Sequence, residues 1–319
     1  MWKSTVQQYL FPDMSSTTEM PLPVNVASVP QRSPFRYPGG KTWFVPTFRQ
    51  WIKSLHTKPH LLIEPFAGGG IISLTALFEN LVSKVLLCEL DEDVASVWET
   101  IVHGEADWLA EKILTFDITR ENIIHELAKT STDIRQRAFQ TILKNRTYHG
   151  GILASGSGLL KEGEKGKGIK SRWYPATIAK RLQNLNLVRD RIQFIKADAL
   201  EIIPRYTLEP DTIFFLDPPY TAGGKKAGKR LYKHFALDHA LLFEMASKIA
   251  GHFIMTYDCA EEVKELARKY HFQMHMIPMS NTHHSKIWEL VIGKNLTWVN
   301  DLTVMCERSA VVNPKNWTQ

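Results

Sequence analysis

Short apolar runs alternate with helical segments along this sequence; the alternation is interrupted once and then resumes. Strands are expected at His60–Ile63, Lys84–Leu90, Ile192–Ala197, Thr212–Leu216, His252–Thr256, Phe272–Ile277 and Ile287–Ile292. Helices are expected at Ile71–Leu81, Asp91–Val102, Leu200–Tyr206, Ala240–Ile249 and Glu261–Tyr270. Strands that alternate with helices usually pair in parallel through right-handed crossovers. The sequence therefore predicts an α/β fold with a Rossmann-like, mainly parallel sheet, and the short spacing of its last two strands predicts an antiparallel pair at the sheet edge.

The interruption covers residues 104–190, where helical patterns dominate. They fall at Asp107–Leu114, Arg120–Ala128, Ile134–Lys144 and Ala176–Val188, and the Gly- and Lys-rich stretch Gly150–Tyr174 is expected to be a hairpin or loop. We interpret residues 104–190 as an inserted, mainly helical domain. The main domain then comprises residues 31–103 and 191–300, with residues 1–30 as a flexible N-terminal arm and 301–319 as a C-terminal tail.

Composition narrows the class of protein only partly. The net charge of +6 and the pI of about 9.1 favour phosphate-bearing partners, but many basic proteins bind no nucleic acid. The three cysteines are far apart, so neither a disulfide framework nor a zinc site is expected, and we predict no bound metal. No stretch approaches 18 apolar residues and no signal-peptide pattern is present, so a cytoplasmic location is expected.

The strongest chemical signal is Asp217-Pro218-Pro219-Tyr220, directly after an apolar strand. Ligands of open parallel sheets bind outside the carboxyl ends of the strands. The Asp217 carboxylate and the Pro218 carbonyl could accept the two N–H groups of an exocyclic amine and so make a poorly nucleophilic nitrogen reactive. Tyr220 offers a flat face for a base, which must leave the duplex to be reached. The alternative is a Pro-rich turn with no function.

A second signal is the turn Glu64–Gly70, in which Phe66, Gly68 and Gly70 lie between a strand and a helix. Glycines allow the backbone to pass close to a ligand, and the Glu64 carboxylate suits a cationic amino-acid group better than a pyrophosphate. Glu89 ends the next strand, where an acidic residue can bind both hydroxyls of a ribose. A plain tight turn and a surface acid are the alternatives.

Together these motifs resemble the Dam-type (class alpha) family of site-specific DNA adenine-N6 methyltransferases. The segment Arg36–Lys41 is similar to the family's aromatic-x-Gly-Gly-Lys motif, Glu64–Gly70 to its loop for S-adenosylmethionine (AdoMet), Cys88–Leu90 to its ribose-binding acid, and Asp217–Tyr220 to its catalytic motif. The resemblance spans roughly residues 33–293, in the family's order. It implies an AdoMet-dependent methyltransferase sheet in which residues 104–190 form the target-recognition domain.

The resemblance also implies roles for single residues. Tyr37, Lys41 and Asp198 are expected at the cofactor, with Asp217 serving cofactor and substrate, although Asp198 could equally be a helix N-cap. In the insert, Asn145 and Arg146 precede a loop that approaches the target base pair in relatives. The chain lacks the arginine that follows this segment in GATC-reading members, so GATC specificity is in doubt.

Two basic stretches are expected to contact DNA phosphates. One ends at Arg172, and the other follows the catalytic motif and contains Lys225, Lys226, Lys229 and Arg230. The alternative for each is a solvated loop.

The expected function is methylation of adenine N6 in double-stranded DNA by a bacterial or phage-encoded enzyme. A cognate restriction endonuclease is a possible partner, and the enzyme is expected to be a monomer or weak dimer. Three alternatives stay open: an AdoMet-dependent N4-cytosine or RNA amino-methyltransferase, a nicotinamide dehydrogenase that uses the Gly-rich turn, and a non-catalytic DNA-binding protein. The dehydrogenase leaves Asp217–Tyr220 unexplained, and the intact Asp217 and Lys41 argue against the third.

Overall fold

A computed structural model of the whole chain describes residues 24–37, 39–154, 156–161, 166–220, 234, 236–280 and 286–299. The predicted DNA contacts Lys225, Lys226, Lys229 and Arg230 lie outside these residues, as do the C-terminal tail and most of the N-terminal arm. None of the described helices is long and apolar enough to cross a membrane.

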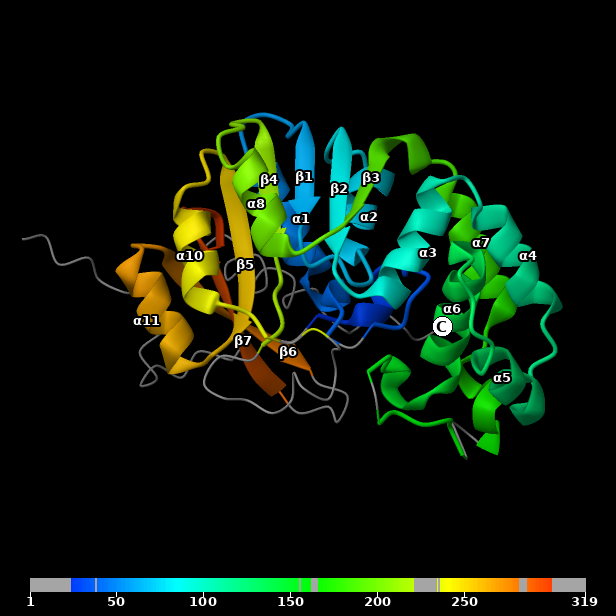
Figure 1. Cartoon of the computed structure of the whole chain (residues 1–319). Helices are drawn as coiled ribbons and strands as arrows, with labels where there is room; N and C mark the ends of the chain where they lie inside the picture. Colours follow the sequence, from blue (N-terminus) through cyan, green and yellow to red (C-terminus); the bar gives the residue numbers. More distant parts are fainter. Residues whose placement is uncertain are drawn as a thin grey trace, which may run out of the picture.

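A seven-stranded sheet in the order β3-β2-β1-β4-β5-β7-β6 forms the centre of the molecule (Figure 1). Its strands are β1 (Leu61–Glu64), β2 (Lys84–Glu89), β3 (Ile192–Lys196), β4 (Thr212–Leu216), β5 (His252–Asp258), β6 (Gln273–Ser280) and β7 (Lys286–Gly293). Strands β1 to β5 pair in parallel, and β7 runs antiparallel to both β5 and β6. The α/β prediction and the antiparallel edge pair are therefore confirmed, with boundaries shifted by a few residues at most.

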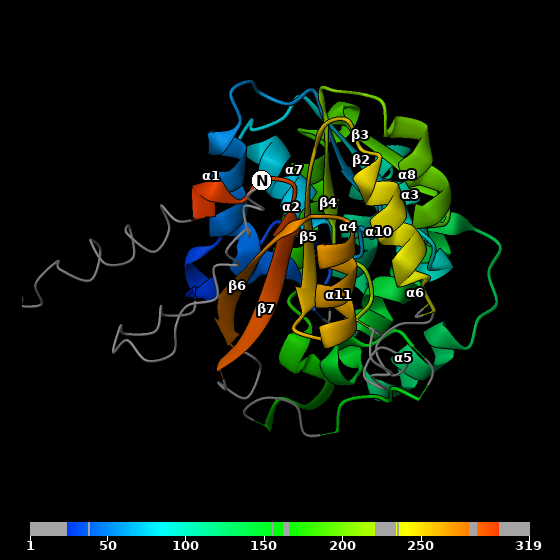
Figure 2. The same ribbon diagram turned by 90° about the vertical axis from the view of Figure 1, so that its left-hand side faces the viewer.

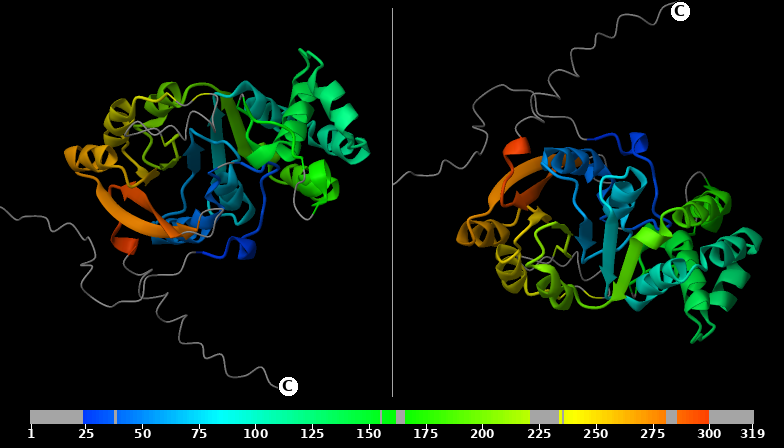
Figure 3. Two further views of the ribbon diagram at one scale, coloured as in Figure 1. Left: turned by 90° about the horizontal axis from the view of Figure 1, so that it is seen from below. Right: turned by 90° about the horizontal axis from the view of Figure 1, so that it is seen from above.

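Alternating side chains of each strand divide the core between the two faces of the sheet. Leu62 of β1 packs on the side of α1 (Val45–Ser54), α2 (Ile71–Phe78) and α3 (Glu92–Val102). Ile63 packs on the side of α8 (Ala199–Tyr206), α10 (His239–Ser247) and α11 (Glu261–Lys269). Figures 2 and 3 show these two helix layers enclosing the twisted sheet. The prediction missed α1, although Val45, Phe48 and Ile52 are buried at helical spacing.

The insert consists of α4 (Ala106–Thr115), α5 (Arg120–Leu127), α6 (Ile134–Thr147) and α7 (Pro175–Leu185). These helices lie together beside α3, at the β3 end of the sheet (Figures 1 and 3). Between α6 and α7, the described residues contain only short 3-10 turns and one isolated bridge, Tyr148 to Leu159. The insert therefore lies at the same side of the sheet as β1 and β2, which respectively precede the predicted Gly-rich turn and carry Glu89.

Candidate functional site

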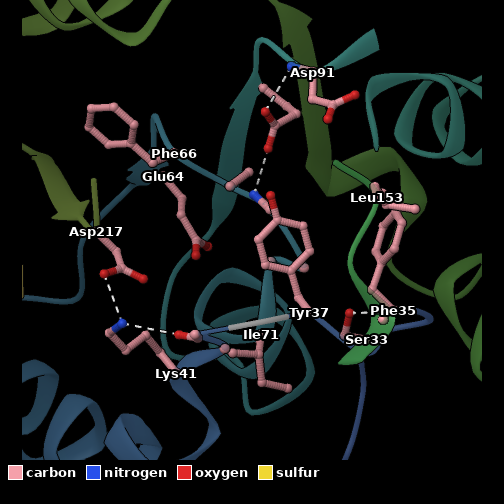
Figure 4. A pocket seen from close by; sticks show the side chains of 18 of the residues that line it. Ser33, Phe35, Tyr37, Lys41, Glu64, Phe66, Ile71, Asp91, Leu153 and Asp217 are labelled. Atoms are coloured by element: carbon pink, nitrogen blue, oxygen red, sulfur yellow. Dashed lines mark hydrogen bonds and ion pairs between the residues drawn. The ribbon is translucent and has the colours of Figure 1, made fainter. Parts of the chain in front are cut away.

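A pocket of ≈ 420 Å³ lies at the carboxyl ends of β1, β2 and β4 (Figure 4). Strand order reverses between β1 and β4, because β2 and β3 lie on one side of this pair and β5 lies on the other. Such a reversal leaves a crevice above the strand ends, where open α/β sheets bind ligands. The lining includes these predicted residues: Tyr37, Lys41, Glu64, Phe66, Gly68, Gly70, Glu89, Arg146, Arg172, Asp198 and Asp217.

The Gly-rich turn after β1 is held in a shape that its glycines permit. Gly68 and Gly70 have φ values of +46° and +61°, in the left-handed region that favours glycine. A Cβ atom on Gly68 would lie 2.6 Å from the Tyr37 ring, and one on Gly70 would lie 2.9 Å from Trp98. Trp98 also donates a hydrogen bond from Nε1 to the Gly68 carbonyl, at 2.9 Å. Tyr37 therefore packs directly on the turn, next to the pocket where it is predicted to contact the cofactor.

Glu64 is the last residue of β1, and its carboxyl group lies between Asp217 and Tyr37 in Figure 4. Its Oε2 accepts hydrogen bonds from Ser73 N at 3.1 Å and Ser73 Oγ at 2.6 Å, in the first turn of α2. Burial raises the pKa of Glu64 to about 8, although the two bonds from Ser73 and the charge of Lys41 lower it. A cationic group entering the pocket would stabilise the ionised form of this carboxyl group.

Glu89 and Asp198 line the same side of the pocket at the ends of β2 and β3. Glu89 accepts hydrogen bonds from three backbone N–H groups, those of Gly68, Leu90 and Asp91. Burial raises the pKa of Glu89 to about 7. Asp198 caps α8 by accepting from Leu200 N at 2.8 Å, so the helix-cap alternative is correct, and its place in the pocket wall leaves the cofactor role open as well. We refer to Glu64, Glu89, Asp198 and Asp217 as the acidic end of the pocket.

Asp217 follows β4 and has its two carboxylate oxygens in different surroundings. Oδ1 is 2.9 Å from the Lys41 ammonium and accepts hydrogen bonds from Thr256 Oγ1 at 2.8 Å and Tyr220 OH at 3.1 Å. No described residue donates a hydrogen bond to Oδ2. The carboxylate is therefore oriented through one oxygen while it also lines the pocket. Of the two prolines that follow, Pro219 lines the pocket and Pro218 is buried, so the predicted role of the Pro218 carbonyl stays a prediction.

Tyr220 is oriented by contacts that the sequence did not predict. Its ring stacks on Tyr257 with centroids 5.8 Å apart, and the Lys41 ammonium lies 4.9 Å from its centroid. Its hydroxyl lies 3.0 Å from Glu289 Oε2 and 3.1 Å from Asp217 Oδ1, so the two carboxyl groups share its single donated proton. Burial and these two carboxylates raise the pKa of Tyr220 well above its ordinary value, so the hydroxyl stays protonated. Stacking of a base on Tyr220 stays a prediction, because in this structure the ring already stacks on Tyr257.

Glu289 and Thr256 come from β7 and β5, and neither was predicted as a site residue. Glu289 is only 7% exposed, its carboxyl group lies 3.9 Å from Lys41 Nζ, and burial raises its pKa. The one available signal is a charged residue inside the apolar run Ile287–Ile292. Buried carboxyl groups are uncommon without a partner, and here the partners are Lys41 and Tyr220.

The structure shows Asn145 holding backbone groups, and its predicted contact with DNA stays a prediction. Its side chain is fully buried: Oδ1 accepts from Arg36 N at 2.8 Å, and Nδ2 donates to Arg36 O at 2.9 Å and to Gly151 O at 2.8 Å. Every one of these bonds is to backbone. Asn145 therefore fixes the segment Ser33–Arg36, which we call the strap, against α6, and contact with a base would require this packing to open.

Two arginines of the insert also hold the strap through backbone oxygens. Arg146 donates to the Pro34 carbonyl, and Arg181 donates to the Ser33 carbonyl at 3.0 Å. Both residues line the pocket with Arg36 and Arg172, and the charges that shift the pKa of Arg146 are those of Arg181, Arg36, Arg172 and Tyr174. We call Arg36, Arg146, Arg172 and Arg181 the arginine end of the pocket. Of these, Arg146 and Arg172 were predicted to bind DNA, whereas Arg36 and Arg181 were not singled out.

Comparison with known proteins supplies the family context for this site. The sequence model of a family described as "D12 class N6 adenine-specific DNA methyltransferase" matches residues 37–278. No curated protein matches the chain. Among solved structures, the chain is similar to the rRNA methyltransferase AviRa from Streptomyces viridochromogenes, with 13% identity, 81% of this chain and 86% of that chain covered, and a TM-score of 0.37. It is also similar to TrmK of M. capricolum in complex with S-adenosyl-homocysteine, with 9% identity, 85% and 88% covered, and a TM-score of 0.33.

Proposed function

Because the chain belongs to the D12 class N6 adenine-specific DNA methyltransferase family, we propose that it methylates a flipped-out adenine at a specific site in double-stranded DNA. The family makes AdoMet the cofactor and DNA the substrate. Family membership leaves open which residues hold each molecule and how the amine is activated, and both points can be argued from the pocket.

The acidic end of the pocket fits AdoMet by its chemistry. The cofactor carries a cationic ammonium group, a ribose with two hydroxyls and an adenine ring. The buried Glu64 carboxyl suits the ammonium group, and Glu89 suits the ribose because a carboxylate has about four acceptor positions. Tyr37, Phe66 and Gly68 supply flat or unobstructed surface beside these acids. We assign Asp198 to the adenine because it lines the pocket after β3, where the family resemblance implies a residue near that ring.

The observation that carries the catalytic proposal is the unequal use of the two Asp217 oxygens. Oδ1 is fixed by Lys41, Thr256 and Tyr220, and Oδ2 has no donor among the described residues. Oδ2 is thus available to accept an N–H of a target amine, and the fixed Oδ1 sets the direction in which it does so. A fixed acceptor avoids the reorganisation that a mobile side chain would need during the reaction.

When bound, AdoMet supplies an electrophilic methyl group on a positively charged sulfur. Asp217 accepts one amine hydrogen and the Pro218 carbonyl accepts the other, so that the N6 lone pair is directed away from the ring. Transfer of that methyl group to N6 would break its bond to sulfur and would leave a neutral thioether. N6 then releases one proton, and Asp217 Oδ2 is the nearest proposed acceptor. The base must be outside the duplex for this contact to form.

Lys41, Tyr220 and Glu289 act on Asp217 and not on the reacting atoms. Lys41 orients the Asp217 carboxylate through the 2.9 Å contact. The protonated Tyr220 hydroxyl joins Asp217 to Glu289, and so ties the catalytic motif to β7. We infer that these three residues position the carboxylate before substrate arrives.

Methylation of unmethylated genomic DNA tests the proposed function directly. Purified protein would be incubated with AdoMet and DNA from a methylation-deficient strain, and modified bases would be mapped by long-read sequencing. We expect N6-methyladenine at one short recurring sequence. Methylation of cytosine N4 alone, or of RNA alone, would contradict the proposal. Resistance of the modified DNA to a restriction endonuclease from the same source would test the predicted partner.

A further inference from the structure

The arginine end of the pocket concentrates positive charge from several elements of the chain. Arg36, Arg146 and Arg181 have no ion-paired carboxylate among the residues that the structure describes, and Arg172 lines the same wall. Arg146 is only 6% exposed, and its Nε is buried with no hydrogen-bond partner in the described part of the chain. Buried charged groups are normally paired, because removing a charge from water is costly. Among the described residues, Arg146 is therefore a buried charge without a counter-ion.

The pKa values of Arg146 and Arg36 are lowered by burial and by the positive charges of their neighbours. Burial lowers the pKa of Arg146 to about 9, and repulsion from Arg181, Arg36 and Arg172 adds to the effect. Burial lowers the pKa of Arg36 too, with a further contribution from Arg172. A bound anion would remove this repulsion and would recover the free energy that the cluster costs.

We propose that the arginine end binds a phosphodiester group of the target DNA strand, next to the nucleotide whose base enters the acidic end. The proposal rests on the proposed function, because it takes DNA as the substrate. Guanidinium groups match phosphate geometry with two parallel hydrogen bonds. Both ends belong to one pocket, so a nucleotide bound there could place its base toward Asp217 and its phosphate toward the arginines.

The cofactor carboxylate is a weaker match for the same site. AdoMet has one carboxylate but also an ammonium and a sulfonium cation, which the four guanidinium groups would repel. The acidic end attracts those cations and so holds the cofactor away from the arginines. DNA carries only negative charge along its backbone, so each arginine adds to its binding.

Tyr174 gives the arginine end a second nucleic-acid feature. It lines the pocket beside the four arginines, and 47% of its surface is exposed although it is a large aromatic residue. Exposed aromatic rings next to basic groups stack on unpaired bases, while the basic groups bind the backbone. Tyr174 is thus suited to contact a base that has lost its partner when the adenine leaves the duplex.

Arg36 is the best residue for a test, because its side chain makes no hydrogen bond to any described residue. Arg146 and Arg181 also hold the strap, so changing them could disturb the fold. The experiment measures binding of a fluorescent DNA duplex to the full chain over a range of salt concentrations, with saturating S-adenosylhomocysteine. A plot of log affinity against log salt concentration has a negative slope, and we expect Arg36→Ala to reduce the magnitude of this slope by about 0.9, the contribution of one phosphate contact. Arg36→Lys should restore most of that magnitude.

Arg205→Ala is the matched control. It removes the same charge from the exposed last turn of α8, outside the pocket lining, and should leave the slope unchanged. An unchanged slope in both Arg36→Ala and a Tyr174→Ala/Arg36→Ala double variant would overturn the inference. A loss of S-adenosylhomocysteine affinity in Arg36→Ala, measured by calorimetry with no change in slope, would overturn it in favour of the cofactor carboxylate.

Methyl transfer by the unchanged protein separates this inference from the proposed function. If that protein methylates adenine but Arg36→Ala keeps its full salt slope, the phosphate site is wrong and the function stands. If Arg36→Ala loses one contact but no methyl group reaches DNA, the phosphate site stands and the function is wrong.

Discussion

The two ends of the pocket hold opposite charges in different ways. At the acidic end, Glu64, Glu89, Asp198 and Asp217 all accept hydrogen bonds from the chain itself. At the arginine end, Arg146 and Arg181 donate to carbonyls, and no described carboxylate pairs with them. The carboxyl groups of the acidic end are therefore oriented by the chain before any ligand binds, although burial favours the protonated form of Glu64, whereas Arg146 and Arg181 have no described counter-ion. We interpret the acidic end as the part of the pocket that serves catalysis and the arginine end as the part that binds an anionic partner.

Replacing Asp217 should produce the largest change, because the acidic end depends on it for catalysis. We expect Asp217→Asn to lower the rate of methyl transfer by about 100- to 10,000-fold, the range typical for loss of a proton acceptor. The rate is measured with tritiated AdoMet and DNA. Since an amide has nearly the same shape as the carboxylate it replaces, DNA affinity should change little. Near-normal transfer by this variant would remove Asp217 from the mechanism.

Replacing Asn145 tests whether the insert holds the strap or reads DNA through this residue. Asn145→Ala would leave the N–H and C=O groups of Arg36 and the C=O of Gly151 without their buried partner. We expect the free energy of unfolding to fall by about 3 kcal/mol, since an unsatisfied buried polar group costs about 1–3 kcal/mol. Urea unfolding measures this loss. Unchanged stability together with weaker DNA binding would contradict the holding role and support the predicted DNA contact.

A smaller effect is expected for Glu64, where the test is a pH dependence. The raised pKa of about 8 means that folded Glu64 keeps its proton in a pH range where the unfolded chain, with an ordinary value of 4.5, has lost it. The folded state then binds more protons, so this group lowers stability as pH rises from about 4.5 to 8. Glu64→Gln should remove that fall in stability, which thermal unfolding at several pH values would detect.

The same variant should alter cofactor binding in the opposite sense. A cationic ligand favours the ionised carboxyl, so AdoMet should bind the unchanged protein more tightly, and with release of a proton, as pH approaches 8. We expect Glu64→Gln to lose about tenfold in affinity at that pH, equivalent to one pKa unit of interaction, and to lose the pH dependence. Calorimetry in two buffers of different ionisation enthalpy measures both quantities. An unaltered pH dependence would place the cofactor ammonium elsewhere.

The acidic end could largely be predicted from sequence because its residues follow strands. Glu64, Glu89 and Asp217 each occur directly at the end of an apolar run, and parallel strands bring such ends to one edge. Glu289 and Thr256 could not be found in this way. They lie within β7 and β5, and only the strand order β4-β5-β7 brings them to Tyr220 and Asp217.

The arginine end was only half predicted, for a related reason. Arg146 and Arg172 lie in segments with a recognisable position or charge, whereas Arg181 lies in a helix whose charges look like those of any solvated surface. The contact of Arg181 with the strap depends on the packing of α7 beside the strap, and the periodicity of the sequence does not predict that packing. Asn145 was predicted to contact DNA, which stays a prediction; its burial could not be predicted, because it follows from tertiary packing and not from local sequence.

The side chains of α6 and α7 hold the strap through hydrogen bonds to its main chain, and the Phe35 ring adds core packing against Trp98. Asn145, Arg146 and Arg181 recognise peptide groups of Ser33, Pro34 and Arg36, and peptide groups are the same whatever side chain they carry. Substitution of Arg36 can therefore leave these hydrogen bonds intact, whereas substitution of the buried Phe35 would disturb the core. Substitution of Asn145, Arg146 or Arg181 would remove the hydrogen bonds themselves. The Arg36 side chain can therefore vary without loss of the backbone anchorage, which depends on the Asn145 side chain and not on its own.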